Sequence, residues 1–505
     1  MLFSNTRIKI VFLGIIFFYL FLFPVIFQPS WEFDNTTQKK RVDQGYIEKN
    51  LKSSGYWNLD FKIHIDNNWS ETKTTYDWCS GSGTWSDPYV IENVTVNGEN
   101  SGSPILIENS NGYFRIKHST FYNSGSGIFP IYEGGIKLVN VTKGIIINNI
   151  AFDNQIGILL YNSENNTILE NIAYSNTHLG ISLEKSNNNY LSENNATHNK
   201  RGIYLYISHN NTLSGNIANN NTSSGIILGE SNNNLVWGNN ISYNIDGSGI
   251  SLSGSNENIV SLNDIENNSY GISLYLCNKN NISENTATNN KGGGIRLSGS
   301  ENNILSGNTA INSKWWGMYL SSSYNNNLSG NKANNNSYYG IYLYRSDSNT
   351  FSRNIANYNN ESGMYLLNSD NNTLSGNIAN YNNESGIDLY SSNYNTLSGN
   401  TANNNKWQGM YLYSSDNNTL SGNIANYNNG SGIFLYYSEN NSVSGNIANN
   451  NYYGINLTSS NYNDITGNTL FDNNICYSED ETCIGNIFKN NICVKVEPNE
   501  DDWII

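Results

Sequence analysis

One glycine recurs along the chain at nearly constant spacing, and this repeat limits the folds that the chain can adopt. A period of 22 to 24 residues is typical of solenoids, in which one repeat is a single structural unit that cannot bury its apolar face alone. The glycine occupies fifteen positions: Gly135, Gly157, Gly180, Gly202, Gly225, Gly249, Gly271, Gly294, Gly317, Gly340, Gly363, Gly386, Gly409, Gly432 and Gly454.

The residues within each unit favour strands. Gly409 is followed by Met-Tyr-Leu-Tyr, the period of two that is expected of a strand with one buried face, and two shorter apolar segments follow at 419–421 and 424–425. Helices are excluded because Gly and Asn clusters interrupt every unit. The pattern therefore predicts an all-β parallel β-helix, a solenoid of about 15 coils with about 23 residues each.

Three polar columns scarcely vary over the fourteen units that begin at Gly157. Ser stands six residues after the glycine, except where Cys277 replaces it, and Asn stands nine and fourteen residues after the glycine in every unit. Asn tolerates the left-handed backbone of turns, and its amide can bond to the same residue in the next coil. We therefore predict structural ladders that include Ser369, Asn372, Asn377, Ser415, Asn418 and Asn423.

The unit Gly-Ile-x-Leu, Ser, Asn-x-Leu-Ser-Gly-Asn resembles the repeats of the NosD-type and carbohydrate-binding and sugar-hydrolase (CASH) proteins, over about residues 100–490. The resemblance implies a right-handed, single-stranded parallel β-helix of the pectin-lyase-like fold. Residues 79–91 look like the module that often precedes such helices. The resemblance leaves activity open, because this fold carries lyases, hydrolases, epimerases and non-catalytic surface proteins.

The N-terminus carries an export signal. Arg7 and Lys9 precede an apolar run at 10–27, which is long for a signal-peptide core and just long enough to span a bilayer. We expect an extracellular or cell-surface protein that residues 10–27 can anchor in the membrane. The expected organisation is a signal anchor or signal peptide at 1–29, an N-terminal linker and capping region at 30–99, the β-helix at 100–470, and a C-terminal cap with a cysteine cluster at 471–505.

Charge and cysteine content add two constraints. The net charge is −15, and 26 scattered Lys and Arg face 41 Asp and Glu, which argues against nucleic acid as a partner. About twenty Asn-x-Ser/Thr sequons could carry glycans on an exported chain.

Near the C-terminus, Cys476, Cys483 and Cys493 suggest a disulfide that closes the last coil, with the pairing left open.

No catalytic residues are predicted. The repeat region lacks the acidic and His signatures of pectin-type enzymes, and 115–117 matches a short polygalacturonase tripeptide by chance. A copper site would need soft ligands gathered in one place. The methionines Met318, Met364 and Met410 instead fall in the apolar column after the glycine, and His178, His198 and His209 fall in three different columns.

Two surface features are candidate binding sites. An acidic column at Asp347, Asp370, Asp416 and Glu439 is either a calcium site or a solvated edge, and no cofactor is otherwise required. Aromatic residues occupy the outward positions of one strand in consecutive coils, where they either stack on sugar rings or stabilise the sheet. These residues are Tyr342, Tyr344, Tyr365, Tyr390, Tyr411, Tyr413, Phe434 and Tyr436.

The sequence therefore favours a non-catalytic binding or structural rod that contacts polysaccharide or cell-envelope components. One alternative is a carbohydrate-active enzyme of the lyase, hydrolase or epimerase type, with its site in the irregular region 60–135. The other is a NosD-like periplasmic protein of copper or cofactor maturation. Cleavage of a retained glycan would favour the enzyme, and copper retained after dialysis would favour maturation.

Overall fold

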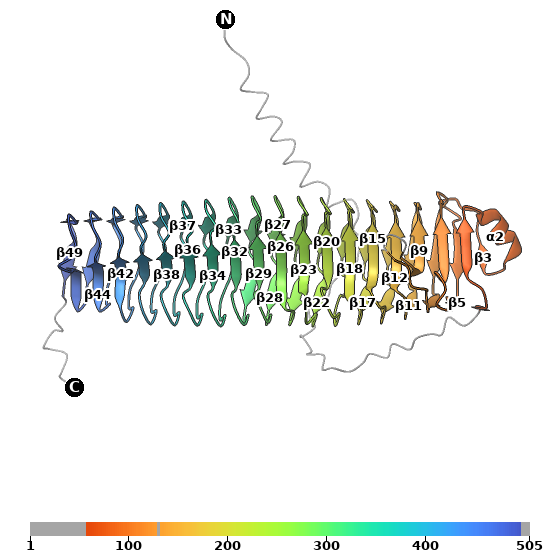
Figure 1. The fold of residues 1–505 in the computed structure, drawn as a ribbon, viewed down its shortest axis with the longest axis horizontal. Coiled ribbons are helices and arrows are strands. Elements are labelled where there is room, and N and C mark those ends of the chain that lie inside the picture. The colour runs from red at the N-terminus through yellow and green to blue at the C-terminus, as the bar shows by residue number, and fades with distance from the viewer. Residues whose placement is uncertain (1–56, 129–131, 496–505) are drawn as a thin grey trace, which may run out of the picture. The chain divides into compact units, whose positions relative to one another are not determined.

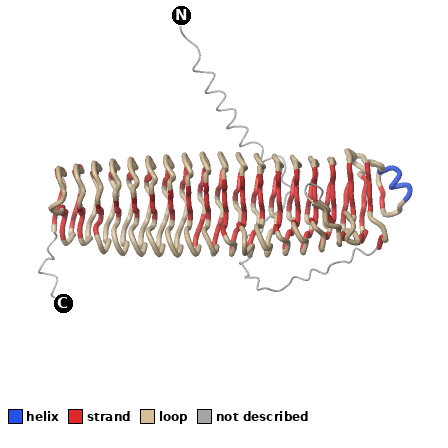
Figure 2. Tube along the Cα trace, in the orientation of Figure 1, coloured by secondary structure: helices blue, strands red, loops and turns tan. Residues whose placement is uncertain are grey.

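The computed structural model describes residues 57–128 and 132–495, so the predicted signal segment at 1–29 lies outside the described residues. The described residues form a β-solenoid whose successive turns stack into an elongated rod (Figure 1). Short strands repeat at the same places in each turn (Figure 2). Across 57–128 and 132–495, no helix is long and apolar enough to span a membrane.

Sheet 1 is a continuous parallel ladder and contains the strand that begins near the repeating glycine. It runs through 18 strands. They are β2 (Ile63–Asp66), β6 (Ile105–Glu108), β9 (Gly134–Val139), β12 (Ile156–Tyr161), β15 (Leu179–Glu184), β18 (Arg201–Tyr206), β20 (Ile226–Gly229), β23 (Ser248–Ser253), β26 (Tyr270–Tyr275), β29 (Ile295–Ser298), β32 (Met318–Ser321), β34 (Ile341–Tyr344), β36 (Met364–Leu367), β38 (Ile387–Tyr390), β40 (Met410–Tyr413), β42 (Ser431–Tyr436), β44 (Tyr453–Thr458) and β47 (Ile475–Glu479).

Two further sheets close each turn. Sheet 2 runs in parallel from β4 (Tyr89–Glu92) to β48 (Ile487–Lys489). Sheet 3 begins at β1 (Trp57–Leu59) and ends at β49 (Ile492–Val494), and isolated bridges such as Ile424 with Ile447 replace its strands in many coils. The predicted parallel β-helix is therefore confirmed.

The number of coils differs from the expected value. The solenoid has about 18 turns, whereas the glycine column predicts about 15. The additional turns contain β2, β6 and β47, which lie outside the interval between the first and last framing glycine. The coils consequently extend past the expected range of 100–470 at both ends.

The two ends are closed differently. At the N-terminal end, α2 (Trp69–Thr75) lies over the first coils, and Trp69, 2% exposed, stacks 5.0 Å from Tyr89 and donates a 2.7 Å hydrogen bond to Ser110 Oγ. At the C-terminal end, a disulfide joins Cys476 to Cys493, while Cys483 remains a thiol. Such caps protect the open ends of a solenoid from water and from further stacking.

Buried amide ladders hold the coils in register. Asn377 is fully buried, and its Oδ1 accepts 2.9 Å hydrogen bonds from the backbone N and the Nδ2 of Asn354. Its own Nδ2 donates to Phe351 O at 3.0 Å and to Asn400 Oδ1 at 2.9 Å. The amide thus uses both acceptor and both donor capacities, which removes the cost of burying it.

The other ladder columns follow the same rule. Ser392 Oγ accepts a 3.0 Å hydrogen bond from the backbone N of Ser369, and Ser415 Oγ accepts one from Ser392 at 3.0 Å. Asn418 and Asn423, like Asn372, are at most 1% exposed. Cys277 takes its place in the serine column, where its Sγ accepts from the backbone N of Ser255 at 3.5 Å.

A third asparagine ladder was not predicted. It stands nineteen residues after the glycine, as in the hydrogen bonds from the backbone N of Asn359 to Asn382 Oδ1 at 3.0 Å and from Asn382 N to Asn405 Oδ1 at 2.9 Å. This ladder passes close to the framing glycine. A Cβ at Gly386 would lie 2.7 Å from both Ala402 Cβ and Asn405 Nδ2, so only glycine fits there.

Replacing Asn377 with Ala is expected to destabilise the rod by roughly 2–5 kcal/mol, because four buried side-chain hydrogen bonds are lost and the backbone N of Asn354 loses its acceptor in the core. Urea denaturation followed by circular dichroism measures the change, and hydrogen exchange should localise it to the neighbouring coils. Asn360→Ala, at an exposed corner of the adjoining coil, is the matched control and should stay within about 0.5 kcal/mol of the wild type. Equal urea midpoints for the Asn377 and Asn360 variants would contradict the claim that the buried Asn ladder stabilises the coils.

Candidate functional site

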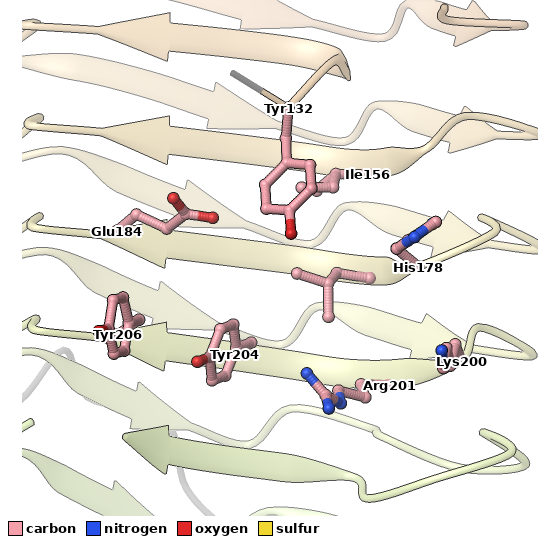
Figure 3. Close-up of a pocket in the computed structure, with 9 residues that line it drawn as sticks. Tyr132, Ile156, His178, Glu184, Lys200, Arg201, Tyr204 and Tyr206 are labelled. Atoms are coloured by element: carbon pink, nitrogen blue, oxygen red, sulfur yellow. The ribbon is translucent and has the colours of Figure 1, made fainter. Parts of the chain in front are cut away.

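A cleft of about 480 Å³ lies on the outer face of sheet 1, over β12, β15 and β18. Figure 3 shows Glu184 and Tyr206 at one side, with His178, Lys200 and Arg201 at the other. The ring of Tyr132 lies between the two groups. The full lining consists of Tyr132, Ile156, His178, Leu179, Glu184, Lys200, Arg201, Tyr204 and Tyr206.

The regular stacking of coils places the charged residues of the cleft. Arg201 opens β18 opposite Leu179, and Glu184 closes β15 opposite Tyr206. The two positions are five residues apart along the strand, or about 16 Å at the usual strand rise. The Arg201 guanidinium extends over the ring of Tyr204, 5.7 Å from its centroid. The cleft is therefore elongated along the strand, with opposite charges at its ends.

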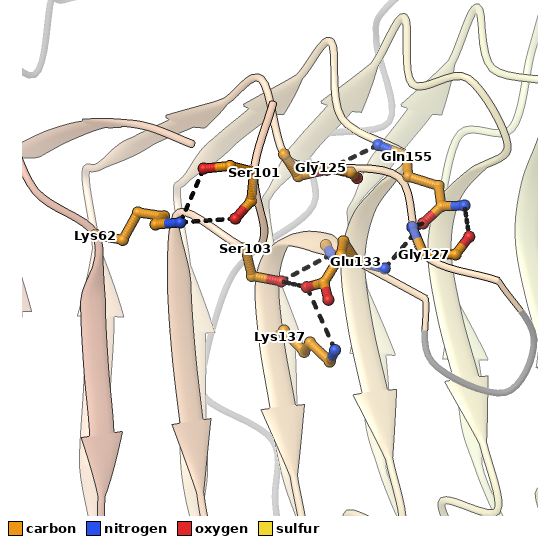
Figure 4. Close-up of polar contacts among 10 residues, drawn as sticks. Lys62, Ser101, Ser103, Gly125, Gly127, Glu133, Lys137 and Gln155 are labelled. Atoms are coloured by element: carbon orange, nitrogen blue, oxygen red, sulfur yellow. Dashed lines mark hydrogen bonds and ion pairs between the residues drawn. The ribbon is translucent and has the colours of Figure 1, made fainter. Parts of the chain in front are cut away.

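Tyr132 lies before β9 and next to Glu133, whose backbone is bonded to the side chain of Gln155 (Figure 4). Gln155, 5% exposed, accepts hydrogen bonds from the backbone N of Gly127 at 2.8 Å and of Glu133 at 2.9 Å. The Glu133 carboxylate in turn accepts from Ser103 Oγ at 2.6 Å and pairs with Lys137 at 3.3 Å. Because Glu133 is held in this way, the neighbouring Tyr132 is positioned against the cleft.

Burial and charge shift the pKa of two groups in the cleft. Burial raises the pKa of Glu184, which is 3% exposed, and the nearby Ser182 hydroxyl and the charges of Lys137 and Lys185 oppose this effect. Burial lowers the pKa of His178, and the neighbouring Lys200 and Arg201 lower it further. The cleft therefore combines a carboxyl group, Glu184, that holds its proton more readily than usual with two cationic side chains, Lys200 and Arg201, at the opposite end.

The predicted aromatic residues lie together farther along sheet 1, in β34 to β42. Most are half-buried, and Tyr390 is 37% exposed. Ring centroids of neighbouring coils are 5.4 Å apart for Tyr342 and Tyr365, 5.2 Å for Tyr411 and Phe434, and 4.3 Å for Tyr390 and Tyr413. We call the following residues the aromatic strip: Trp316, Tyr319, Tyr339, Tyr342, Tyr344, Tyr365, Tyr390, Tyr411, Tyr413, Phe434 and Tyr436.

A buried carboxyl group interrupts the strip, and sequence reasoning missed it. Asp388 takes the place of a ring in the column, opposite Tyr365 in one neighbouring coil and Tyr411 in the other. It is 9% exposed, and its Oδ1 has no hydrogen-bond partner among the described residues. Its other oxygen lies 3.4 Å from Ser362 Oγ. The signal was available, since from Tyr319 to Phe434 every residue of this column other than Asp388 is Tyr or Phe.

The environment of Asp388 favours its neutral form. Burial raises the pKa of Asp388 to about 8, and the charge of Glu384 adds to this effect, while a hydrogen bond with Ser362 opposes it. Burial also raises the pKa of Glu384 to about 7, assisted by its contact with Glu361. Burial likewise raises the pKa of Tyr365 and Tyr411. Burial therefore disfavours the charged forms of the acidic groups in this part of the strip.

The predicted acidic column forms a surface hydrogen-bond ladder. Asp347 Oδ1 accepts from the backbone N of Asp370 at 2.8 Å, and Asp416 Oδ1 accepts from the backbone N of Glu439 at 2.7 Å. Each partly exposed carboxylate therefore caps the next coil. Among the described residues, no group of three or more His, Cys, Asp or Glu side chains is arranged to hold a metal ion.

Two family models match the chain. The model described as periplasmic copper-binding protein (NosD) matches residues 82–269 and 245–378, more than half of the chain. The model described as right-handed beta helix region matches residues 316–470. These matches confirm the resemblance inferred from the repeat. No curated protein sequence matches the chain significantly.

Solved structures with similar folds include sugar-modifying enzymes. The periplasmic alginate epimerase AlgG is 15% identical, with 86% of this chain and 84% of that chain covered and a TM-score of 0.36. The A-module of Azotobacter vinelandii mannuronan C-5 epimerase AlgE4 is 13% identical, with 78% and 89% covered and a TM-score of 0.33. DFA-IIIase from Arthrobacter chlorophenolicus without its lid is 11% identical, with 59% and 93% covered and a TM-score of 0.38. Likeness at these TM-scores says nothing about activity.

The described residues do not fit the copper site that the family description suggests. Copper sites gather soft or imidazole ligands in one place. Met318, Met364 and Met410 are fully buried in alternate coils of the core. His209 accepts a 3.0 Å hydrogen bond from the backbone N of Asn232, and His178 lies in the cleft beside Lys200 and Arg201. No described pair of these side chains converges on one point.

Replacing Asp388 with Asn is expected to stabilise the protein at alkaline pH. The folded pKa of about 8 lies above the ordinary value of 3.8, so between these values the unfolded chain ionises while the folded group keeps its proton, and the wild type loses stability as the pH rises toward 8. The advantage of the variant should grow from pH 5 to about pH 8 and then level off, with a gain on the order of 4 kcal/mol over that interval. Urea midpoints at both pH values test this, with Asp370→Asn in the surface column as control. A difference that does not change with pH would refute the assignment.

Proposed function

The chain belongs to the NosD family, and from its surface we propose that it is an exported, non-catalytic rod that binds polysaccharide along the outer face of sheet 1. The observation that carries the proposal is the aromatic strip, whose rings stack from coil to coil over β32 to β36 and again over β38 to β42. Cell-envelope glycans are the expected partners.

Rings that only stabilised the sheet would be expected to cover one another and leave little surface. In the strip the rings instead keep one part packed and one part open, and Tyr390 is 37% exposed. Tyr combines an apolar face, which can lie against a sugar ring, with a hydroxyl group that can bond to sugar hydroxyls. The coils are about 4.8 Å apart, a spacing comparable to the length of one pyranose unit.

Export is supported by features outside the strip. The apolar run at 10–27 follows Arg7 and Lys9, which favours a signal sequence or a membrane anchor. A disulfide between Cys476 and Cys493 suits an oxidising compartment. The family description names the periplasm. Together these features support a location outside the cytoplasm, on the cell surface or beyond it.

A carbohydrate-active enzyme is the second candidate, and the cleft is the observation that favours it. Glu184 is a buried carboxyl group whose pKa burial raises, which is the property of a general acid. Tyr132, the one lining residue from the predicted irregular region 60–135, lies in the same cleft. New reducing ends or unsaturated products from a bound glycan would favour this candidate over the binding rod.

Replacing Tyr365, Tyr411 and Tyr413 together with Ala is expected to reduce retention of polysaccharide at least tenfold, because the stacking of rings on sugars is lost in two coils, at β36 and β40. Affinity electrophoresis in gels that contain acidic or neutral polysaccharides measures retention. The control replaces Tyr358 and Tyr381, which stack 5.1 Å apart away from the strip, and should leave retention unchanged. Full retention by the triple variant, with an unchanged circular dichroism spectrum, would sink the proposal.

A further inference from the structure

The cleft over β12, β15 and β18 differs in chemistry from the aromatic strip on the same sheet. The chain as a whole carries a net charge of −15, yet one end of the cleft gathers His178, Lys200 and Arg201. We propose that this cleft is a binding site for a carboxylated oligosaccharide, in which Arg201 and Lys200 hold a sugar carboxylate. The inference deepens the proposed function, since it names an acidic glycan as ligand, and it rests on that function.

The cationic end is available to a ligand. None of the ion pairs among the described residues involves Lys200 or Arg201. The Nε of Arg201 is buried without a hydrogen-bond partner in the described part of the chain. Lys200 and His178 are exposed at the rim. A carboxylate placed here would supply the partner that the guanidinium lacks, through the paired hydrogen bonds that Arg and carboxylates form.

The middle of the cleft offers apolar surface for a sugar ring. Tyr132 and Tyr204 pack against Ile156, Leu159 and Leu179, so the two phenol rings are held by a small apolar cluster. Gln155 fixes the segment that carries Tyr132 (Figure 4). The volume of about 480 Å³ lies within the range of sites for small organic ligands. A preformed cleft of this kind lowers the entropic cost of binding.

The opposite end of the cleft sets the orientation of the ligand. Glu184 is 3% exposed, and no ion pair of the described residues uses its carboxyl group. A carboxyl group accepts hydrogen bonds from sugar hydroxyls and repels a second anion. The distance of about 16 Å between the two ends along the strand exceeds one pyranose ring. The expected ligand is therefore an oligosaccharide with its carboxylate at Arg201 and hydroxyls at Glu184.

A carboxylate is favoured over a sulfate or a phosphate by the donors present. The guanidinium of Arg201 is planar and, because it lies over the Tyr204 ring, presents its donors in one direction, which suits a planar anion. The buried Glu184 would add a cost for a more highly charged ligand. Neutral sugars would leave the guanidinium unpaired.

Isothermal titration calorimetry of the full chain with a galactose tetramer that ends in one galacturonic acid, a neutral galactose tetramer and a galactose tetramer that carries one terminal sulfate tests the inference. We expect the uronic acid tetramer to bind at least tenfold more tightly than the other two. Arg201→Gln and, separately, Lys200→Gln should weaken that binding at least tenfold. Lys279→Gln, which removes an exposed cation outside the cleft, should leave it unchanged.

Unchanged binding in either cleft variant, or equal affinity for the neutral or sulfated tetramer, would overturn the inference. Lys200 is exposed, so Lys200→Gln should fold normally and provides the test if Arg201→Gln is unstable. The triple variant of the strip separates this inference from the proposed function. If the strip variant keeps full retention of polysaccharide while the cleft variants lose the tetramer, the strip proposal fails and the cleft site stands.

Discussion

Buried asparagine amides, each bonded to the amide above and below, are the interaction on which the rest of the structure depends. An isolated amide in the core would be costly, but an amide with two donors and two acceptors in a column satisfies them all with its equivalents and with nearby carbonyls. Asn377 shows the complete set. Since such bonds exist only when coils lie in the same register, the ladders determine both the spacing and the alignment of every turn.

This arrangement leaves the outward positions of sheet 1 free to vary. The ladders, the glycine column and the inward Ile and Leu residues carry the stability, and each coil contacts chiefly its neighbours. A change at an outward position therefore has a local cost. The same face accommodates a charged cleft over β12 to β18 and an aromatic strip over β32 to β42, and the Asn ladder fourteen residues after the glycine continues unbroken between them.

The sequence predicted the fold because the residues that form the turns and ladders recur at the same positions of each unit. The glycine and the first two Asn columns are invariant over fourteen units, so periodicity alone revealed them. The third Asn ladder was not recognised in the sequence, because neighbouring positions of the same corner also hold many Asn residues and because Ser313 replaces Asn in one unit. The coils at β2, β6 and β47 were left out of the predicted number because they lack the framing glycine. The aromatic strip was visible for the opposite reason, since its rings stand at fixed offsets from that glycine.

The sites that depart from the repeat were harder to predict, and the reason is geometric. Stacking places residues about 23 positions apart side by side, so the cleft joins Tyr132, His178 and Arg201, which belong to different units and different columns. Asp388 was hidden for another reason: its column marks it as outward, whereas the neighbouring rings bury it. A regular scaffold of this kind makes irregular residues informative. Asp388 shows this, because a carboxyl group buried among aromatic rings lowers the stability of its coil at every pH at which the same group would be ionised in water.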